Sequence, residues 1–195
     1  MKLLPLLPAS ALIALGLLLA AGAQDAPPAE TAAAPAKPVS VFLVRHAEKA
    51  EAAPGERDPE LSPAGRERAE LLARMLAEAC VTHLYASEYR RTQNTLAPLA
   101  QRLGLAVQEI SARDPAHQVA ALEDLPAGSV AVVAGHSNTL PDLAGRLGGE
   151  LRELTAHPSY GPMLPDDAYD RLVLITLPVG SEGRAQTIEL RFGDG

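Results

Sequence analysis

From residue 39 onward, short runs of aliphatic and β-branched residues alternate with longer stretches in which apolar residues recur at helical spacing. The first run, VSVFLV, is apolar almost throughout, which is typical of a strand buried on both faces of a parallel sheet. The expected strands are residues 39–44, 82–87, 105–110, 129–135, 171–177 and 185–192. The expected helices are a first one after the capping pair Ser62-Pro63 and three more at residues 88–103, 117–125 and 140–147.

Strands that alternate with helices predict an α/β fold. We expect a three-layer α/β/α sandwich with a mostly parallel sheet. The last two strands follow each other without a helix between them, so they should form an antiparallel edge.

The N-terminus differs from the rest of the chain. Residues 1–23 start with the basic Lys2, continue as an apolar run and end in Ala-Gly-Ala, the features of a bacterial-type signal peptide. Residues 24–38 are rich in Ala and Pro and lack apolar periodicity, which is typical of a linker. We therefore expect a signal peptide (1–23), a linker (24–38) and one folded domain (39–195). The signal peptide predicts that the protein is periplasmic or secreted. Retention of the first segment as an anchor is the alternative; after cleavage we expect no stable membrane insertion.

Composition argues against several functions. The chain has 24 acidic and 17 basic residues and a formal net charge of −7, whereas a nucleic-acid-binding protein carries a basic patch. Three histidines, His83, His117 and His157, lack the spacing of metal ligands, so we expect no metal and no cofactor. The single cysteine, Cys80, ends an apolar helical stretch and is expected to be buried.

Polar and charged side chains follow the predicted strands where each one ends. They form four groups, which are Arg45-His46, Arg90-Arg91, Arg113-Asp114 and His136-Ser137-Asn138. Because the carboxyl ends of parallel strands meet at one edge of the sheet, we expect these groups to converge there. Each group alone has a structural explanation, such as a capped loop or a solvated helix face, but the set as a whole does not.

Arginines and histidines together suit phosphoryl chemistry. Guanidinium groups match the oxygens of a phosphoryl group and stay charged, and a helix N-terminus adds backbone N–H donors. A neutral imidazole is a nucleophile that needs no metal ion, and phosphoryl transfer mostly requires positioning and charge neutralisation. The sequence therefore predicts a phosphoryl-transfer site at this edge of the sheet.

The order RHAEK, SEYRRTQNT and GHSNT resembles the histidine phosphatase superfamily, which has the phosphoglycerate-mutase-like fold, in its larger phosphatase-type branch. The resemblance covers about residues 39–192 and includes LSPAGRERAE after the first motif. It implies that His46 is the nucleophile that becomes phosphohistidine, that Arg45 and Arg91 bind the phosphoryl group, and that His136 is the second histidine of the pocket. Arg90 then is an exposed neighbour.

The resemblance also suggests further site residues. Ser137 and Asn138 match the residues that touch phosphate, and Glu48 of the first motif is a candidate substrate-binding residue or the partner of a nearby arginine. Family members often carry the proton donor after the third strand, where Asp114 lies; Glu109 and Glu48 are the alternatives. Where many members have Arg-His-Gly, this chain has Ala47, which should keep the loop and narrow it slightly.

The resemblance and the signal peptide together predict an exported, metal-independent phosphatase that hydrolyses a phosphomonoester, a small-molecule or sugar phosphate, through phosphohistidine. For this mechanism we expect His46 neutral and His136 protonated. A non-catalytic phosphate-binding module with the same pocket is the alternative. A phosphohistidine-protein phosphatase is the other, if the signal peptide is not used.

Overall fold

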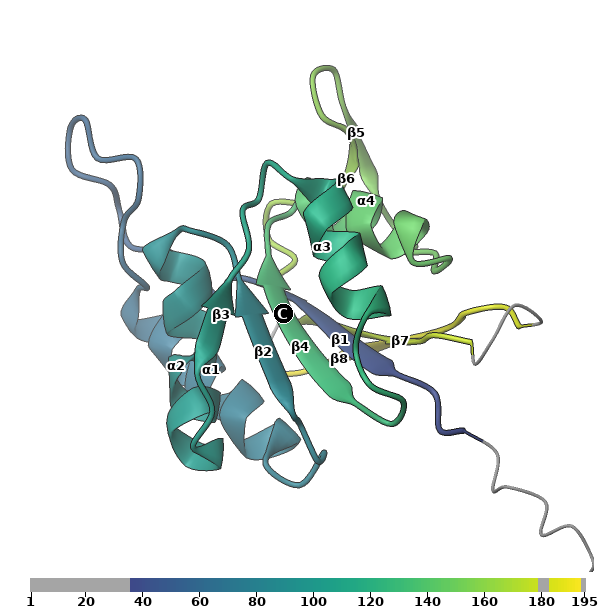
Figure 1. The fold of residues 1–195 in the computed structure, drawn as a ribbon. Helices are drawn as coiled ribbons and strands as arrows, with labels where there is room; N and C mark the ends of the chain where they lie inside the picture. Colours follow the sequence, from purple (N-terminus) through teal and green to yellow (C-terminus); the bar gives the residue numbers. More distant parts are fainter. Residues whose placement is uncertain (1–35, 179–182, 194–195) are drawn as a thin grey trace, which may run out of the picture. The chain divides into compact units, whose positions relative to one another are not determined.

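The computed structural model describes residues 36–178 and 183–193, and the predicted signal peptide and most of the linker lie outside them. The strands are β1 (Ser40–Arg45), β2 (His83–Ala86), β3 (Val107–Glu109), β4 (Val130–Gly135), β5 (Thr155–His157), β6 (Gly161–Met163), β7 (Arg171–Thr176) and β8 (Gln186–Arg191). The helices are α1 (Pro63–Leu76), α2 (Arg90–Leu103), α3 (Pro115–Glu123) and α4 (Thr139–Arg146) (Figure 1).

Six strands form one sheet in the order β3-β2-β4-β1-β7-β8. Strands β3, β2, β4 and β1 are parallel to one another, whereas β7 and β8 are antiparallel to their neighbours. This arrangement confirms the mostly parallel sheet and its antiparallel edge.

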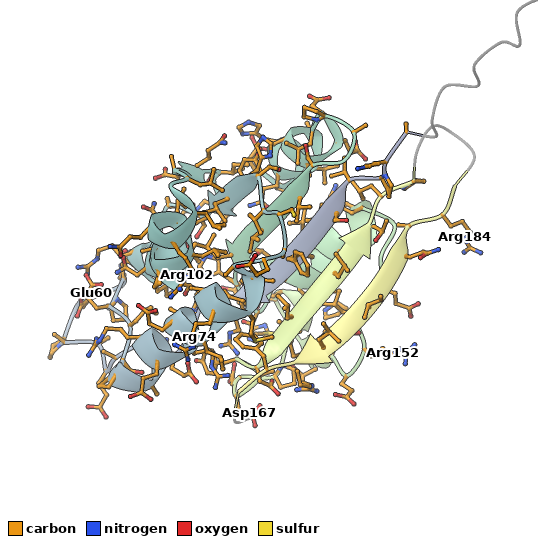
Figure 2. The ribbon with its side chains drawn as sticks, turned by 90° about the horizontal axis from the view of Figure 1, so that it is seen from below. Glu60, Arg74, Arg102, Arg152, Asp167 and Arg184 are labelled. Carbon is orange, nitrogen blue, oxygen red and sulfur yellow. The ribbon has the colours of Figure 1, made fainter. Side chains whose placement is uncertain are left out.

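The central strands are apolar on both sides because each side faces a layer of helices. Val41 and Leu43 of β1 pack in one core with Leu122 of α3 and Leu143 of α4. Val44, which points to the other face, packs in a second core with residues of α1 and α2 such as Leu72 and Leu96. The predicted three-layer sandwich is therefore correct, and the exposed arginines of α1 and α2, Arg74 and Arg102, lie on the side away from the sheet (Figure 2).

Two helices begin at the same local signal, a capping residue followed by proline. The Ser62 hydroxyl accepts a hydrogen bond from the Gly65 backbone N–H, and the Asp114 carboxylate accepts one from the N–H of His117. Gly65 also lets α1 approach the loop after β1, because a Cβ atom there would lie 2.1 Å from the carbonyl oxygen of Glu48.

The sequence-based expectations differ from the structure at Cys80 and in the segment before β7. Cys80 is exposed: α1 already ends at Leu76, and Cys80 lies in the following turn with a φ of 54°. The segment before β7 contains the short antiparallel hairpin β5–β6, which the sequence did not predict. Its three-residue strands are almost entirely exposed and have no apolar alternation, so the usual strand signal is missing.

Candidate active site

The site forms where β1 and β4 end side by side. The two strands pair in parallel with Arg45 opposite Gly135, and the N–H of His46 donates to the Gly135 carbonyl at 2.9 Å. His136, the first residue after β4, therefore lies next to His46, with 5.4 Å between the ring centroids. Only 6% of His46 and 8% of His136 is exposed.

The hydrogen bond of the His46 ring identifies its tautomer. Nδ1 lies 2.8 Å from the carbonyl oxygen of Ala47, and because a carbonyl can only accept, Nδ1 carries the proton. Nε2 then keeps its lone pair. Burial lowers the pKa of His46 from 6.5 to about 3; the bond to Ala47 opposes the shift, and His136 and the two nearby arginines add to it. The imidazole is thus neutral at pH 7, as expected for a nucleophile.

His136 is held by a chain of hydroxyl groups. Its Nδ1 lies 3.5 Å from Nη2 of Arg91, which can only donate, so Nε2 carries the proton and donates to the Ser87 hydroxyl at 2.8 Å. The Ser87 hydroxyl lies 2.8 Å from that of Thr92. Burial, then Arg91 and Arg45, lower the pKa of His136 to about 4, and Asp58 opposes them. His136 is therefore neutral in the free site, contrary to the sequence-based expectation of a protonated ring.

Arg45 lies on the other side of His46, almost fully buried. Its Nη1 donates to the backbone carbonyls of Pro165 and Asp166 at 2.8 and 2.9 Å, and the guanidinium lies 4.1 Å from the ring centroid of Tyr169. Burial lowers its pKa, but an arginine stays protonated in proteins. Its Nε is buried and has no hydrogen-bond partner among the described residues.

The two consecutive arginines of α2 face different surroundings. Arg91 contacts His136, packs over the ring of Tyr89 at 4.2 Å and donates from Nη1 to Asp58 Oδ1 at 3.0 Å. Arg90 is half exposed and forms ion pairs with Glu56, Asp58 and Glu60 of the loop between β1 and α1. Arg91 therefore lies in the site, whereas Arg90 binds the loop between β1 and α1 through its ion pairs.

The carboxylates predicted as proton donors lie in other contacts. Glu48 forms an ion pair with Arg68 at 2.7 Å, which is the alternative the sequence left open for it. Glu109 is exposed and accepts from Gln93, and Asp114 is exposed and caps α3. None of the three has a hydrogen bond or ion pair with the site histidines or arginines among the described residues.

Asp58 is the carboxylate that the sequence analysis missed. It accepts from Arg91 as well as from the backbone N–H of Arg90. Arg91 lies 33 residues after Asp58 in the sequence, and the loop that carries Asp58 has no periodic pattern. The only signal in the sequence is that Asp58 is an acidic residue, a type that can pair with a site arginine.

The remaining predicted residues lie around the histidines. Ser137 and Asn138 are partly buried just before α4, and the Ser137 carbonyl accepts from the N–H of Leu164. Ala47 is fully buried against Leu61 and Ala69, and its N–H donates to the Thr95 hydroxyl at 2.9 Å. The small side chain at this position thus fits a closed space behind His46.

Within residues 36–178 and 183–193, no group of three or more His, Cys, Asp or Glu side chains is arranged to hold a metal ion. No helix in the same ranges is both long and apolar enough to span a bilayer.

Part of the site, but not His136, lies in the region that matches a known family. The model of the histidine phosphatase superfamily (branch 1) matches residues 41–113, which include Arg45, His46 and Arg91. The first part of the folded region is therefore similar to the histidine phosphatase superfamily. No curated protein matches the sequence of this chain.

Solved structures of phosphatases share the fold. One from Agrobacterium tumefaciens, assigned as the phosphohistidine phosphatase SixA, has a TM-score of 0.53 at 25% identity, covering 71% of this chain and 92% of that one. A mycobacterial glucosyl-3-phosphoglycerate phosphatase has a TM-score of 0.52 at 18% identity, with 72% and 91% covered. A protein from Escherichia coli assigned as an α-ribazole-5′-phosphate phosphatase has a TM-score of 0.56 at 18% identity, with 79% and 96% covered. These likenesses show that the chain has the same fold as these phosphatases.

The lowered pKa values predict a pH-dependent stability. Between about pH 4 and pH 6.5 the unfolded chain binds more protons at His46 and His136 than the folded chain does, so stability falls as the pH falls through this window. From pH 7.5 to pH 5 each histidine should lower the free energy of unfolding by about 2 kcal/mol.

Urea unfolding of the full chain at a series of pH values measures this effect. The variant His136→Gln should lose about half of the histidine-dependent slope, whereas His117→Gln, which removes an exposed imidazole, should leave it unchanged. A slope that is the same in His136→Gln and the parent would show that His136 takes up its proton in the folded state as readily as in the unfolded chain.

Proposed function

We propose that this protein hydrolyses a phosphomonoester, without a metal ion, through a phosphohistidine on His46. The observation that carries the proposal is the Nδ1–H bond of His46 to the Ala47 carbonyl, which leaves the Nε2 lone pair free for attack on phosphorus. The two arginines and the second histidine that surround this ring supply the environment that such an attack needs.

The arginines are suited to hold the phosphoryl oxygens. The Nε of Arg45 is a buried donor without a partner among the described residues, and the Nη2 of Arg91 lies 3.5 Å from Nδ1 of His136. Donors of fixed geometry and permanent charge neutralise the equatorial oxygens of the transition state without reorganisation. The unprotonated Nδ1 of His136, which faces Arg91, can accept a proton from the bound phosphate monoanion, and the ring can then act as a cationic donor to the phosphate.

Two steps complete the reaction. Nε2 of His46 forms a bond to phosphorus while the bond to the leaving oxygen breaks, and water then releases phosphate from the phosphohistidine. We propose that water protonates the leaving oxygen, because Asp114, Glu109 and Glu48 all contact other groups. Asp58 likewise contacts other groups, because it pairs with Arg90 and Arg91.

Two other functions use the same pocket. A non-catalytic anion-binding protein would need the arginines but not the nucleophile. A phosphohistidine-protein phosphatase is favoured by the similarity to the structure assigned as SixA and by the lack of contact between the predicted acids and the histidines, because a phosphorylated nitrogen can leave without a protein acid. Export, proposed below, separates this chain from intracellular phosphorelays.

We also propose that the protein is exported to the periplasm or secreted. The support is the sequence of residues 1–23 and the Ala/Pro-rich segment that follows. Expression in a bacterium, followed by N-terminal sequencing of the protein from the periplasmic fraction, should find a mature chain beginning at Gln24. A chain that stays in the cytoplasm with Met1 intact would contradict export and favour the phosphohistidine-protein phosphatase.

Hydrolysis of p-nitrophenyl phosphate by the full chain in EDTA tests the reaction. The variant His46→Ala should lose activity by roughly 10³-fold or more because it removes the nucleophile, whereas His117→Ala should match the parent. Equal turnover by His46→Ala and the parent would exclude the phosphohistidine mechanism. Activity that is lost in EDTA and restored by zinc would contradict the metal-independent reaction, and tight phosphate binding without turnover of any ester would favour the anion-binding protein.

A further inference from the structure

A groove lies between the start of α4, which begins three residues after His136, and the hairpin β5–β6. Its inner end is formed by Asn138 and Thr139, and its outer end by Tyr160 and Pro162 of the hairpin. Thr139 is part of the site's own framework, because its hydroxyl accepts from the N–H of His136 at 3.1 Å. The groove has a volume of about 900 Å³, which is in the range of a ligand site larger than one phosphate. We call it the Asn138–Tyr160 groove.

The hairpin is tied to the site at its base. The N–H of Leu164, next to β6, donates to the Ser137 carbonyl, and the carbonyls of Pro165 and Asp166 accept from Arg45. In Figure 1 the hairpin projects from the edge of the sheet at which β4 ends. Contacts to the site and the packing of Leu164 in the apolar core thus fix the base of the hairpin, whose own strand residues are almost entirely exposed.

Tyr160 is unusually exposed for a large aromatic side chain. Its exposed fraction is 62%, and its ring lies 4.8 Å from that of His157 on the opposite strand, between the ring centroids. The His157 ring, tilted by 32° from that of Tyr160, supports the Tyr160 ring at the outer end of the groove. Such an exposed ring suits the apolar face of a ring in a ligand.

The charges of the groove nearly cancel. Asp142 and Arg146 pair with each other at 2.8 Å, which leaves Glu150 as the unbalanced charge. The other polar groups at the inner end are neutral amides and hydroxyls, as on Gln118 and Thr139. A negatively charged leaving group would therefore find no unpaired cation among the lining residues, whereas a neutral group with many hydroxyls would find hydrogen-bond partners.

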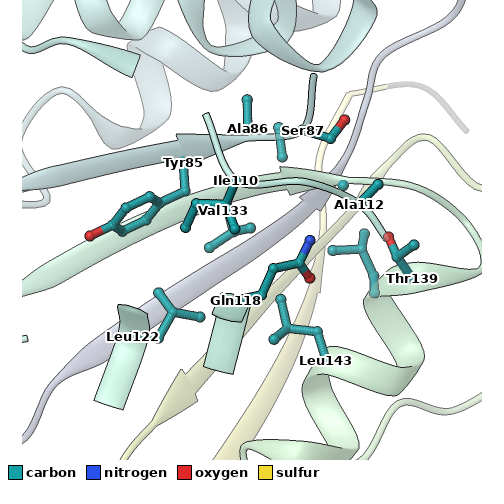
Figure 3. A pocket seen from close by; sticks show the side chains of 13 residues that line it. Tyr85, Ala86, Ser87, Ile110, Ala112, Gln118, Leu122, Val133, Thr139 and Leu143 are labelled. Carbon is teal, nitrogen blue, oxygen red and sulfur yellow. The ribbon is translucent and has the colours of Figure 1, made fainter. Parts of the chain in front are cut away.

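The groove continues inward into a small cavity. The two share Ala112, Gln118 and Thr139, and the cavity reaches Ser87, the partner of His136. Figure 3 shows the side chain of Gln118 among mostly aliphatic lining residues. Only about 10 Å³ of the cavity can take the centre of a water molecule, so it closes the inner end of the groove and leaves the open part toward Tyr160 for a ligand.

We propose that the Asn138–Tyr160 groove binds the leaving group of the substrate, that this group is a neutral saccharide of more than one ring, and that Tyr160 determines this specificity. The inference rests on the proposed reaction at His46. The saccharide would place hydroxyl groups against the neutral polar side chains and a ring face against Tyr160, while its phosphate is held by the two arginines.

Steady-state kinetics of the full chain with trehalose 6-phosphate and p-nitrophenyl phosphate test the proposal. The variant Tyr160→Ala should lower kcat/KM for the disaccharide phosphate by about tenfold, mainly through KM, and leave p-nitrophenyl phosphate within about twofold. Tyr160→Phe should behave like the parent because it keeps the ring. Ile188→Ala, which removes a 52% exposed side chain on β8, is the matched control and should change neither value.

Several outcomes would overturn the subsite. They are an equal loss of both activities in Tyr160→Ala, no loss for the disaccharide phosphate, and a Tyr160-dependent preference for fructose 1,6-bisphosphate or for a phosphoserine peptide. If the parent hydrolyses none of these esters, the proposed phosphatase reaction is contradicted. The groove is then tested separately, by calorimetric measurement of trehalose 6-phosphate binding. Binding of trehalose 6-phosphate by the parent that weakens in Tyr160→Ala supports the groove, and equal or absent binding contradicts it.

Discussion

Parallel pairing of β1 with β4 is the constraint on which the rest of the site depends. The register places Arg45 opposite Gly135, so the next residue of each strand is a histidine and the two rings meet. Both strands are covered by helices on each face, and their packed cores leave no freedom to shift the register by one residue, which would turn the apolar side chains to the wrong layer. The chemistry of the pocket thus depends on the same contacts as the fold.

Burial and charge together determine the protonation of the pocket. Both histidines are almost inaccessible to solvent and lie near two arginines, which lowers both pKa values and keeps both rings neutral. The neutral ring of His46 with an unprotonated Nε2 is a nucleophile, and the neutral ring of His136 with an unprotonated Nδ1 is a proton acceptor. The bound phosphate, which brings negative charge, is then the group that can raise the pKa of His136 within the catalytic cycle.

Much of this arrangement could be predicted from the sequence. The uninterrupted apolar run before Arg45 predicted a doubly covered strand, and Ser62-Pro63 predicted the start of α1 at the residue where it begins. The groups after β1, β2 and β4 were expected at one edge, because parallel strands end together, and the structure brings Arg45, His46, Arg91 and His136 together there.

What could not be predicted depends on contacts between distant loops. Asp58 lies in a loop without periodicity, and the hairpin β5–β6 has no buried face that would leave an apolar pattern. Asp114 follows the third strand as the family resemblance suggested, but its carboxylate caps α3, because the residue before a helix-starting proline is favoured as a cap. The protonation of His136 needed the burial and distances that only the structure provides.

The central claim is that the Nε2 atom of His46 attacks phosphorus. The most direct measurement is rapid quenching of the full chain with substrate under alkaline conditions, followed by ³¹P NMR and mass spectrometry of the trapped protein. The account predicts a phosphoryl group on His46 attached to Nε2, because Nδ1 is occupied by its bond to the Ala47 carbonyl. A phosphoryl group on Nδ1 of His46, or on any other residue, would contradict it.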